Sequence, residues 1–286
     1  MIIDTHQHFW NVGTPWAKAP EDYKILAEPE GITGTILRLE ETQEGLDLAV
    51  REPFIVGVCG KIKRGPQFEE ELEKFCADPL FRGICFLGKE LEGVDGTFLS
   101  DLKKLAAKDL QLDLLRVLPV FFGGPKAMQA AYKGTPQSME GMFTIAERVP
   151  DLRIVVEHIG GMAIDGNPIT KHWEDIFRRM AKYPQIYVKV SGLMERATTR
   201  ADNERATELL SFYRPALDAI WELFGEDRLI YGSNWPVSEH AGDFIVNGLR
   251  IVRRYFAEKG EEASIKYFWK NSQKVYKWVG RLPSQR

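Results

Sequence analysis

The chain has 286 residues, of which 44% are hydrophobic and 28% are charged, and its formal net charge is −3. This balance is typical of a globular protein with a sizeable apolar core, and it lacks the long basic run of a nucleic-acid-binding protein. No segment approaches the roughly 18 apolar residues of a membrane span, and the first residues do not resemble a secretory leader. We therefore expect a cytoplasmic protein that acts on a small molecule, with neither a nucleic-acid nor a membrane partner.

Short runs rich in β-branched residues alternate with longer amphipathic segments along the chain. The predicted strands are residues 2–5, 34–39, 54–60, 83–87, 112–117, 153–158, 186–191 and 228–233. The predicted helices between them include residues 67–77, 98–108, 136–149, 169–182, 205–224 and 244–259. Because the strands are apolar on both faces and separated by helices, the pattern predicts a parallel sheet that is covered on both sides.

Two architectures are built from such alternating units, the open doubly wound sheet and the closed barrel. The count of eight strands, and the absence of a Gly-x-Gly-x-x-Gly motif after the first, favour an α/β fold of the (β/α)8 TIM-barrel type. No linker or composition break divides the chain, so we expect one domain over residues 1–286. Residues 265–278 predict an extra C-terminal helix with Phe268, Val275 and Trp278 on one side, which either packs outside the barrel or closes its bottom.

Polar residues suited to a metal or catalytic site stand where three of these strands end. His6 and His8 close the first strand, and residues two apart point to the same face with α-carbons about 6.5 Å apart, so two imidazoles could hold one divalent ion. His158 closes the sixth strand, and Asn234 follows the eighth. A lone histidine is more often a structural residue than a ligand. Active sites of barrels form at the carboxyl ends of the strands, and the convergence of these residues there predicts a site.

At this point the chain resembles the amidohydrolase-related proteins, a family that includes sugar-lactone hydrolases and pyrone-dicarboxylate lactonases. The resemblance covers almost the whole chain. It rests on the motifs IIDTHQHFW (2–10), FRGICF (81–86), LRIVVEHIGG (152–161), IYVKVSGL (186–193), DRLIYGSNWPV (227–237) and FWKNSQKVYKW (268–278). It implies a distorted eight-stranded barrel in which His6, His8 and His158 are the site histidines. Some members bind one divalent ion there, with zinc the metal expected here, whereas some lactonases work without a metal.

Two departures from the family pattern matter. The usual Gly-Ser-Asp-Trp-Pro after the eighth strand is here Gly-Ser-Asn-Trp-Pro, with Asn234 in place of the aspartate. Lactonase relatives also tend to carry an arginine and a histidine after the FRG element, where this chain has Ile84, Cys85 and Phe86. The first departure concerns catalysis, and the second concerns substrate recognition.

An asparagine can orient a water molecule or the substrate, but it cannot act as a general base. Replacement bases in the sequence are His240, which we favour because an unperturbed imidazole titrates near pH 6.5, together with Glu239 and His158. Glu157 is a weaker candidate, because strand alternation predicts that it faces the helix layer. The alternative interpretation of His240 and Glu239 is that both are solvated loop residues.

Positive and aromatic side chains near strand ends are candidates for binding an acidic or sugar-like substrate: Arg38, Arg116, Lys189, Arg196 and Trp10. Lys189 lies inside an otherwise apolar strand. It is either buried with a partner or directed outward with its stem along a helix.

Three functions remain open. The leading hypothesis is a hydrolase that opens a lactone or similar cyclic ester of a small polar acid, with Asn234, His158 and His240 in catalytic roles. A second is metal-dependent decarboxylation on the same fold, and a third is a non-catalytic small-molecule binder that has lost the aspartate. The family resemblance also makes a homo-oligomer plausible.

Overall fold

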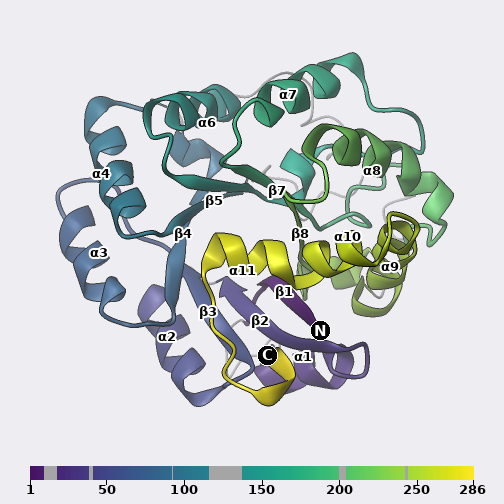
Figure 1. The fold of residues 1–286 in the computed structure, drawn as a ribbon, viewed down its shortest axis with the longest axis horizontal. Coiled ribbons are helices and arrows are strands. Elements are labelled where there is room, and N and C mark those ends of the chain that lie inside the picture. Colours follow the sequence, from purple (N-terminus) through teal and green to yellow (C-terminus); the bar gives the residue numbers. More distant parts are fainter. Residues whose placement is uncertain (10–17, 39–40, 92, 116–136, 200–203, 242–243) are drawn as a thin grey trace.

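A computed structural model describes residues 1–9, 18–38, 41–91, 93–115, 137–199, 204–241 and 244–286 (Figure 1). Eight strands form one sheet in sequence order, and every neighbouring pair is parallel. The strands are β1 (Ile2–Gln7), β2 (Ile32–Arg38), β3 (Ile55–Gly60), β4 (Phe81–Leu87), β5 (Gln111–Leu115), β6 (Arg153–Val156), β7 (Ile186–Val190) and β8 (Leu229–Tyr231). The predicted eight-stranded parallel fold is confirmed, with boundaries that differ by a few residues.

The sheet closes where β1 meets the segment after β8. The Asn234 backbone N–H donates to the His6 carbonyl at 2.7 Å, and the His8 N–H donates to the Trp235 carbonyl at 2.9 Å. Because these bonds lie beyond the end of β8, the barrel is closed at the carboxyl ends of its strands. The segments that carry His6 and Asn234 are therefore neighbours, as the predicted closure requires.

Helices surround the sheet (Figure 1). The α-helices between strands are α1 (Pro20–Ala27), α2 (Thr42–Arg51), α3 (Phe68–Cys76), α4 (Gly96–Ala107), α6 (Gln137–Arg148), α7 (Lys171–Ala181) and α8 (Leu210–Phe224). After β8 follow the π-helical turn Phe244–Gly248 and then α9 (Leu249–Glu258), so the helix predicted over residues 244–259 begins with a wider turn. Their apolar sides form the larger core between helices and sheet.

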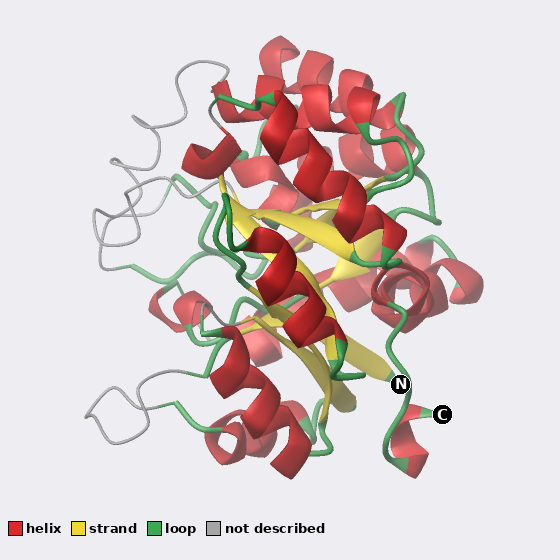
Figure 2. Cartoon of the chain, turned by 90° about the vertical axis from the view of Figure 1, so that its left-hand side faces the viewer, coloured by secondary structure: helices red, strands yellow, loops and turns green. Residues whose placement is uncertain are grey.

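The last helices close the bottom of the barrel. They are α10 (Glu261–Ile265), a π-helical turn (Lys266–Lys270) and α11 (Asn271–Tyr276), and α11 crosses the strands in Figure 1. Val275, Tyr276 and Trp278 join the inner core cluster that includes Ile3 and Tyr187. Figure 2 shows both chain ends on this side of the sheet. Of the two predicted positions for this segment, the structure supports closure of the bottom.

Phe268 is an exception to the predicted apolar face. It packs in the outer core with Tyr231 and Phe256, at ring-centroid distances of 5.6 and 6.5 Å, whereas Val275 and Trp278 face the barrel interior. The reason is the π-helical turn at Lys266–Lys270, which changes the angular position of each residue after it relative to a regular α-helix.

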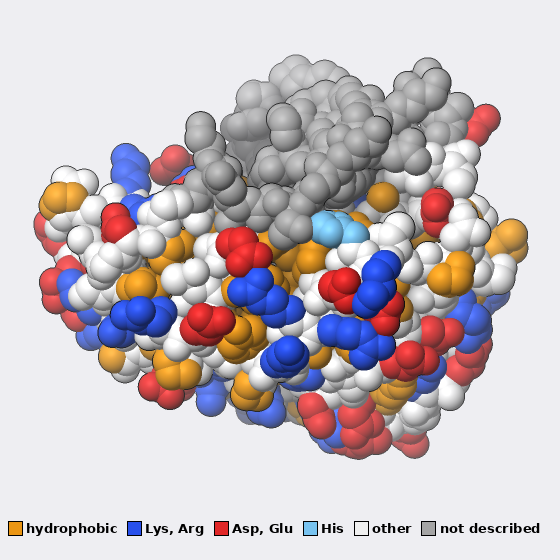
Figure 3. Space-filling view, turned by 90° about the horizontal axis from the view of Figure 1, so that it is seen from above, with side chains coloured by type: hydrophobic (Ala, Val, Ile, Leu, Met, Phe, Trp, Pro, Cys, Tyr) orange, Lys and Arg blue, Asp and Glu red, His pale blue; other side chains and the backbone are white. Residues whose placement is uncertain are grey.

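The described surface has charges of both signs. On the face shown in Figure 3, lysine and arginine side chains alternate with aspartate and glutamate side chains, as expected from 38 basic and 41 acidic residues. Among the described helices, none is long and apolar enough to cross a bilayer.

Candidate active site

The two histidines of the first strand meet inside the barrel. His6 Nε2 lies 3.1 Å from His8 Nε2, and both side chains are buried. Strict alternation from Ile3, which faces the inner core, would direct His6 outward. A register irregularity between Asp4 and Gln7 changes this alternation and brings His6 to the interior. The residues therefore share a face as their spacing predicts, but a bulge decides which face.

His158 approaches the same place from β6. Its ring centroid lies 4.3 Å from that of His6. The chain leaves the extended conformation at His158, where φ is 51°, and stays left-handed at Ile159, where φ is 49°. Such angles are uncommon for residues other than glycine, so the turn is a specific feature of this strand end.

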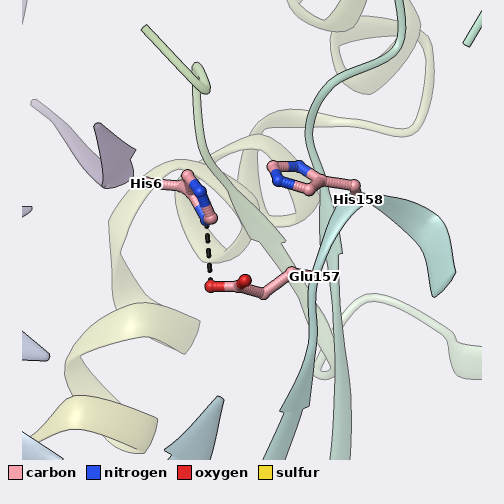
Figure 4. Close-up of side chains that lie close together, drawn as sticks. All are labelled: His6, Glu157 and His158. Carbon is pink, nitrogen blue, oxygen red and sulfur yellow. Dashed lines mark ion pairs between the residues drawn. The ribbon is translucent and has the colours of Figure 1, made fainter. Parts of the chain in front are cut away.

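The prediction that Glu157 faces the helix layer is wrong. Val155 belongs to the inner core cluster, and Glu157, two residues further on, points inward as well. His158 also reaches the interior, because its left-handed backbone breaks the alternation. Figure 4 shows the result, with the Glu157 carboxylate directed at His6 beside the ring of His158. Its Oε1 lies 3.0 Å from His6 Nδ1.

Each histidine has a partner for its Nδ1 atom. His6 faces Glu157, His8 Nδ1 lies 3.0 Å from the Arg38 carbonyl oxygen, and His158 Nδ1 lies 2.9 Å from Ser191 Oγ. A carbonyl oxygen only accepts hydrogen bonds, so His8 carries its hydrogen on Nδ1, and the Glu157 carboxylate 3.0 Å from His6 Nδ1 favours the same tautomer there. Their neutral rings then present two Nε2 lone pairs to each other at 3.1 Å. A cation at this position would remove the repulsion between them, so the donor set fits a divalent metal.

Burial keeps these histidines neutral. It lowers the pKa of His6 to about 4, against the opposing effect of Glu157. Burial, with the neighbouring His6 as the next cause, also lowers the pKa of His8 and of His158 well below the ordinary value. Neutral imidazole is the form that binds metals. His6, Glu157 and His158 each place one potential ligand atom within 4.8 Å of the others.

A chain of buried charges lies beneath the histidines. Lys189 Nζ donates to Asp113 Oδ2 at 2.7 Å, to Glu157 Oε1 at 3.2 Å and to the Thr5 carbonyl at 2.8 Å. The Tyr276 hydroxyl donates to Asp113 at 2.8 Å. Burial alone would raise the pKa of Glu157, but His6, Lys189 and Arg38 hold it well below its ordinary value. This arrangement fixes the carboxylate that orients His6.

Lys189 and Arg38, predicted to bind substrate, both point into the barrel. Lys189 is the buried lysine with partners, and the alternative outward position is wrong. Its three N–H donors are all engaged, which leaves none for a substrate. Arg38 lies with Nε 3.6 Å from Glu157 Oε2 and donates from Nη2 to Cys85 Sγ. Substrate binding by Arg38 stays a prediction.

Asn234 lies beside the histidines through its backbone, and its side chain bonds to a glutamate that the sequence analysis missed. The backbone has φ of 62°, a left-handed angle that asparagine tolerates better than most residues. Its Nδ2 donates to Glu195 Oε1 at 2.7 Å, and both residues are buried. Glu195 stands four residues after Ser191 in the loop that follows β7. An acidic residue just past a strand end was the available signal.

The structure describes only some of the other predicted site residues. Glu239 is exposed, accepts from Trp235 Nε1 at 2.8 Å and pairs with Lys18 at 3.0 Å, which fits the solvated-loop interpretation. Trp10 and Arg116 lie outside the described residues. The backbone of His240 ends the short helix Val237–His240, but its side chain is outside the described part.

The parallel barrel and its buried histidine and carboxylate cluster are the features of a barrel hydrolase with its centre at the carboxyl ends of the strands. Comparison with known families gives the same class. Residues 3–278 match the amidohydrolase family model, and the chain belongs to this family. The predicted family and the predicted hydrolase class are thereby confirmed.

Two curated proteins with similar sequences are sugar-acid lactonases, and a solved structure with a similar fold is an amidohydrolase with bound zinc. The chain is 28% identical over 265 residues to L-fucono-1,5-lactonase from Burkholderia ambifaria, which covers 85% of this chain and 82% of that protein. It is 26% identical over 147 residues to L-rhamnono-gamma-lactonase from Scheffersomyces stipitis, covering 46% and 43% respectively. The crystal structure of an amidohydrolase from Burkholderia multivorans with bound zinc superposes with a TM-score of 0.76 at 22% identity, over 98% of this chain and 100% of that chain. The structural likeness supports the barrel fold.

Proposed function

We propose that this protein hydrolyses a lactone of a small sugar acid to the open hydroxy acid. The support from relatives is the pair of curated sugar-acid lactonases that share its sequence. The observation in the structure that carries the proposal is the cluster of three buried histidines whose Nδ1 atoms each lie within 3.0 Å of an oxygen atom. Such a cluster directs its remaining nitrogens at one place in the barrel mouth.

We further propose that His6, His8 and His158 hold one divalent ion, for which zinc is the first candidate because a related structure binds it. A bound ion would polarise the lactone carbonyl and lower the pKa of a water molecule. The chain's own residues prepare this place: Glu157 orients His6, the Arg38 carbonyl orients His8, and Ser191 orients His158. Roles for Trp10, Arg116 and His240 in substrate binding and proton transfer remain predictions.

The test is turnover of a lactone panel by the purified full chain. The panel contains L-fucono-1,5-lactone, L-rhamnono-1,4-lactone and, as a non-sugar comparison, a homoserine lactone. Titration at constant pH measures acid release, and metal content is determined on the same sample. We expect acid release from the sugar lactones and its loss after chelation, restored by zinc.

The competing functions give different results in this assay. Carbon dioxide release from an aromatic or unsaturated acid, without lactone opening, would favour the decarboxylase. Binding of the sugar lactones without acid release, at full metal occupancy, would favour a non-catalytic binder.

A further inference from the structure

The mouth of the barrel needs a proton acceptor that Asn234 cannot supply, because an amide has no basic oxygen. The histidines have their Nδ1 atoms turned to Glu157, the Arg38 carbonyl and Ser191, and the proposed ion would take their Nε2 atoms. Glu157 is held by His6, Lys189 and Arg38. Glu239 is exposed and bound to Trp235 and Lys18. Both carboxylates are thus already engaged by cations or N–H donors.

Glu195 is placed differently. Its loop begins at Ser191, which contacts His158, and its partner Asn234 donates a backbone hydrogen bond to the His6 carbonyl. The bond of 2.7 Å between Asn234 Nδ2 and Glu195 Oε1 thus joins the two segments that carry the walls of the histidine cluster. With 3% of Glu195 and 1% of Asn234 exposed, the pair is shielded from bulk water.

We infer that Glu195 is the general base of the reaction and that Asn234 is the residue that positions its carboxylate. This inference rests on the proposed lactone hydrolysis. The carboxylate takes one proton of the attacking water as the water oxygen bonds to the carbonyl carbon and the C=O π pair moves onto the carbonyl oxygen. Collapse of the tetrahedral intermediate re-forms the C=O bond and breaks the ring C–O bond. Glu195 then returns the proton to the leaving ring oxygen, and the product is the open hydroxy acid.

This scheme explains why position 234 carries an amide and not a second carboxylate. Two carboxylates at 2.7 Å could not both be ionised, and one would hold a proton. An amide donates to the carboxylate and leaves it charged. Asparagine at 234 and glutamate at 195 therefore act as one unit, with the carboxylate on the β7 loop and the amide on the β8 loop.

The decisive variant is Glu195→Gln, measured on the lactone that the wild type turns over best. The glutamine carbonyl can still accept the hydrogen bond from Asn234, so this contact is retained while the basic oxygen is lost. We expect kcat to fall by about 10²–10⁴-fold, the usual contribution of a general base, with little change in KM. A kcat within fivefold of the wild type would overturn the inference.

A carboxylate swap gives the second measurement. The double variant Asn234→Asp with Glu195→Gln exchanges the amide and the carboxylate within the pair. We expect it to recover at least tenfold of the kcat lost in Glu195→Gln, whereas Asn234→Asp alone places two carboxylates together and lowers activity. A double variant as slow as Glu195→Gln would contradict the idea that the pair shares one carboxylate function.

The matched control is Glu239→Gln, which removes a carboxylate from the neighbouring loop and can still accept from Trp235. It should keep the wild-type kcat. If the wild type opens no lactone, the proposed function fails. If the wild type is active and Glu195→Gln is equally active, only the assignment of Glu195 fails.

Discussion

We call the cluster of His6, His8 and His158 the mouth of the barrel, and the cluster of Lys189, Asp113 and Tyr276 its floor. Both clusters are buried and polar, but their polar groups have different partners. In the mouth, His6 and His8 turn Nε2 atoms towards each other, and His158 Nε2 has no hydrogen-bond partner among the described residues. On the floor, Lys189 has an acceptor for each of its N–H groups, and Asp113 is bound by both Lys189 and Tyr276.

We infer from this difference that the mouth serves the chemistry and that the floor stabilises the fold. Buried polar groups that lack partners cost free energy unless a ligand or ion supplies the missing contact. Groups that satisfy one another hold the fold, and removing one of them leaves an uncompensated charge. Changes on the floor should therefore affect folding first, and changes in the mouth should affect activity first.

The largest effect should come from Lys189→Met. It leaves Asp113 and Glu157 as buried carboxylates without their shared cation, and breaking such a pair costs about 3–5 kcal/mol. Urea denaturation measures this as a lower free energy of unfolding. The control is Lys171→Met, which removes an exposed lysine paired with Asp175 four residues away and should change nothing measurable. Equal stabilities of the two variants would refute the contrast.

Lowering the pH should reduce the free energy of unfolding through the buried histidines of the mouth. The unfolded chain protonates histidine near pH 6.5, whereas folded His6 stays neutral down to a pKa of about 4. The unfolded state therefore binds more protons, and stability is lost as pH falls through this window. For His6 alone, the loss in the metal-free protein is about 3 kcal/mol. Denaturation curves between pH 7 and 4 test it, and a flat profile there would contradict neutral buried histidines.

His8→Asn should affect activity more than folding. The asparagine amide can still donate to the Arg38 carbonyl, but Nε2 is gone. We expect activity to fall about 100-fold, equivalent to roughly 2.7 kcal/mol in the barrier. Zinc affinity should fall as well, while the melting temperature of the metal-free protein should move by only a few degrees. If the metal-free variant failed to fold, His8 would contribute mainly to stability, as the floor residues do.

The smallest effect should be that of Tyr276→Phe on the floor. It removes one hydroxyl donor from Asp113, which keeps Lys189, so we expect a loss of about 1–2 kcal/mol. Thermal unfolding should shift by about 2–4 °C per kcal/mol, with kcat nearly unchanged. A large fall in kcat at constant stability would instead connect the floor directly to catalysis.

Most of the fold could be predicted from local pattern, because each strand is a short apolar run and each helix has its own periodicity. The site was only partly predictable. Glu157 was misplaced because a left-handed His158 cannot be recognised from residue types, and Glu195 was missed because it lies in a loop without periodicity. The inward turn of His6 depends on a bulge that only strand pairing reveals. Contacts such as that of Lys189 with Asp113, 76 residues apart, follow from barrel closure and not from nearby sequence.

The floor is completed late during synthesis, because its residues are far apart in the chain. Asp113 and Tyr276 are 163 residues apart, so at common translation rates of about 5–20 residues per second the carboxylate emerges on the order of ten seconds before its tyrosine. Until then the barrel has no α11 to cover its lower end, and water can reach its interior charges. The interior charges of a nascent chain therefore lack this cover until α11 has left the ribosome.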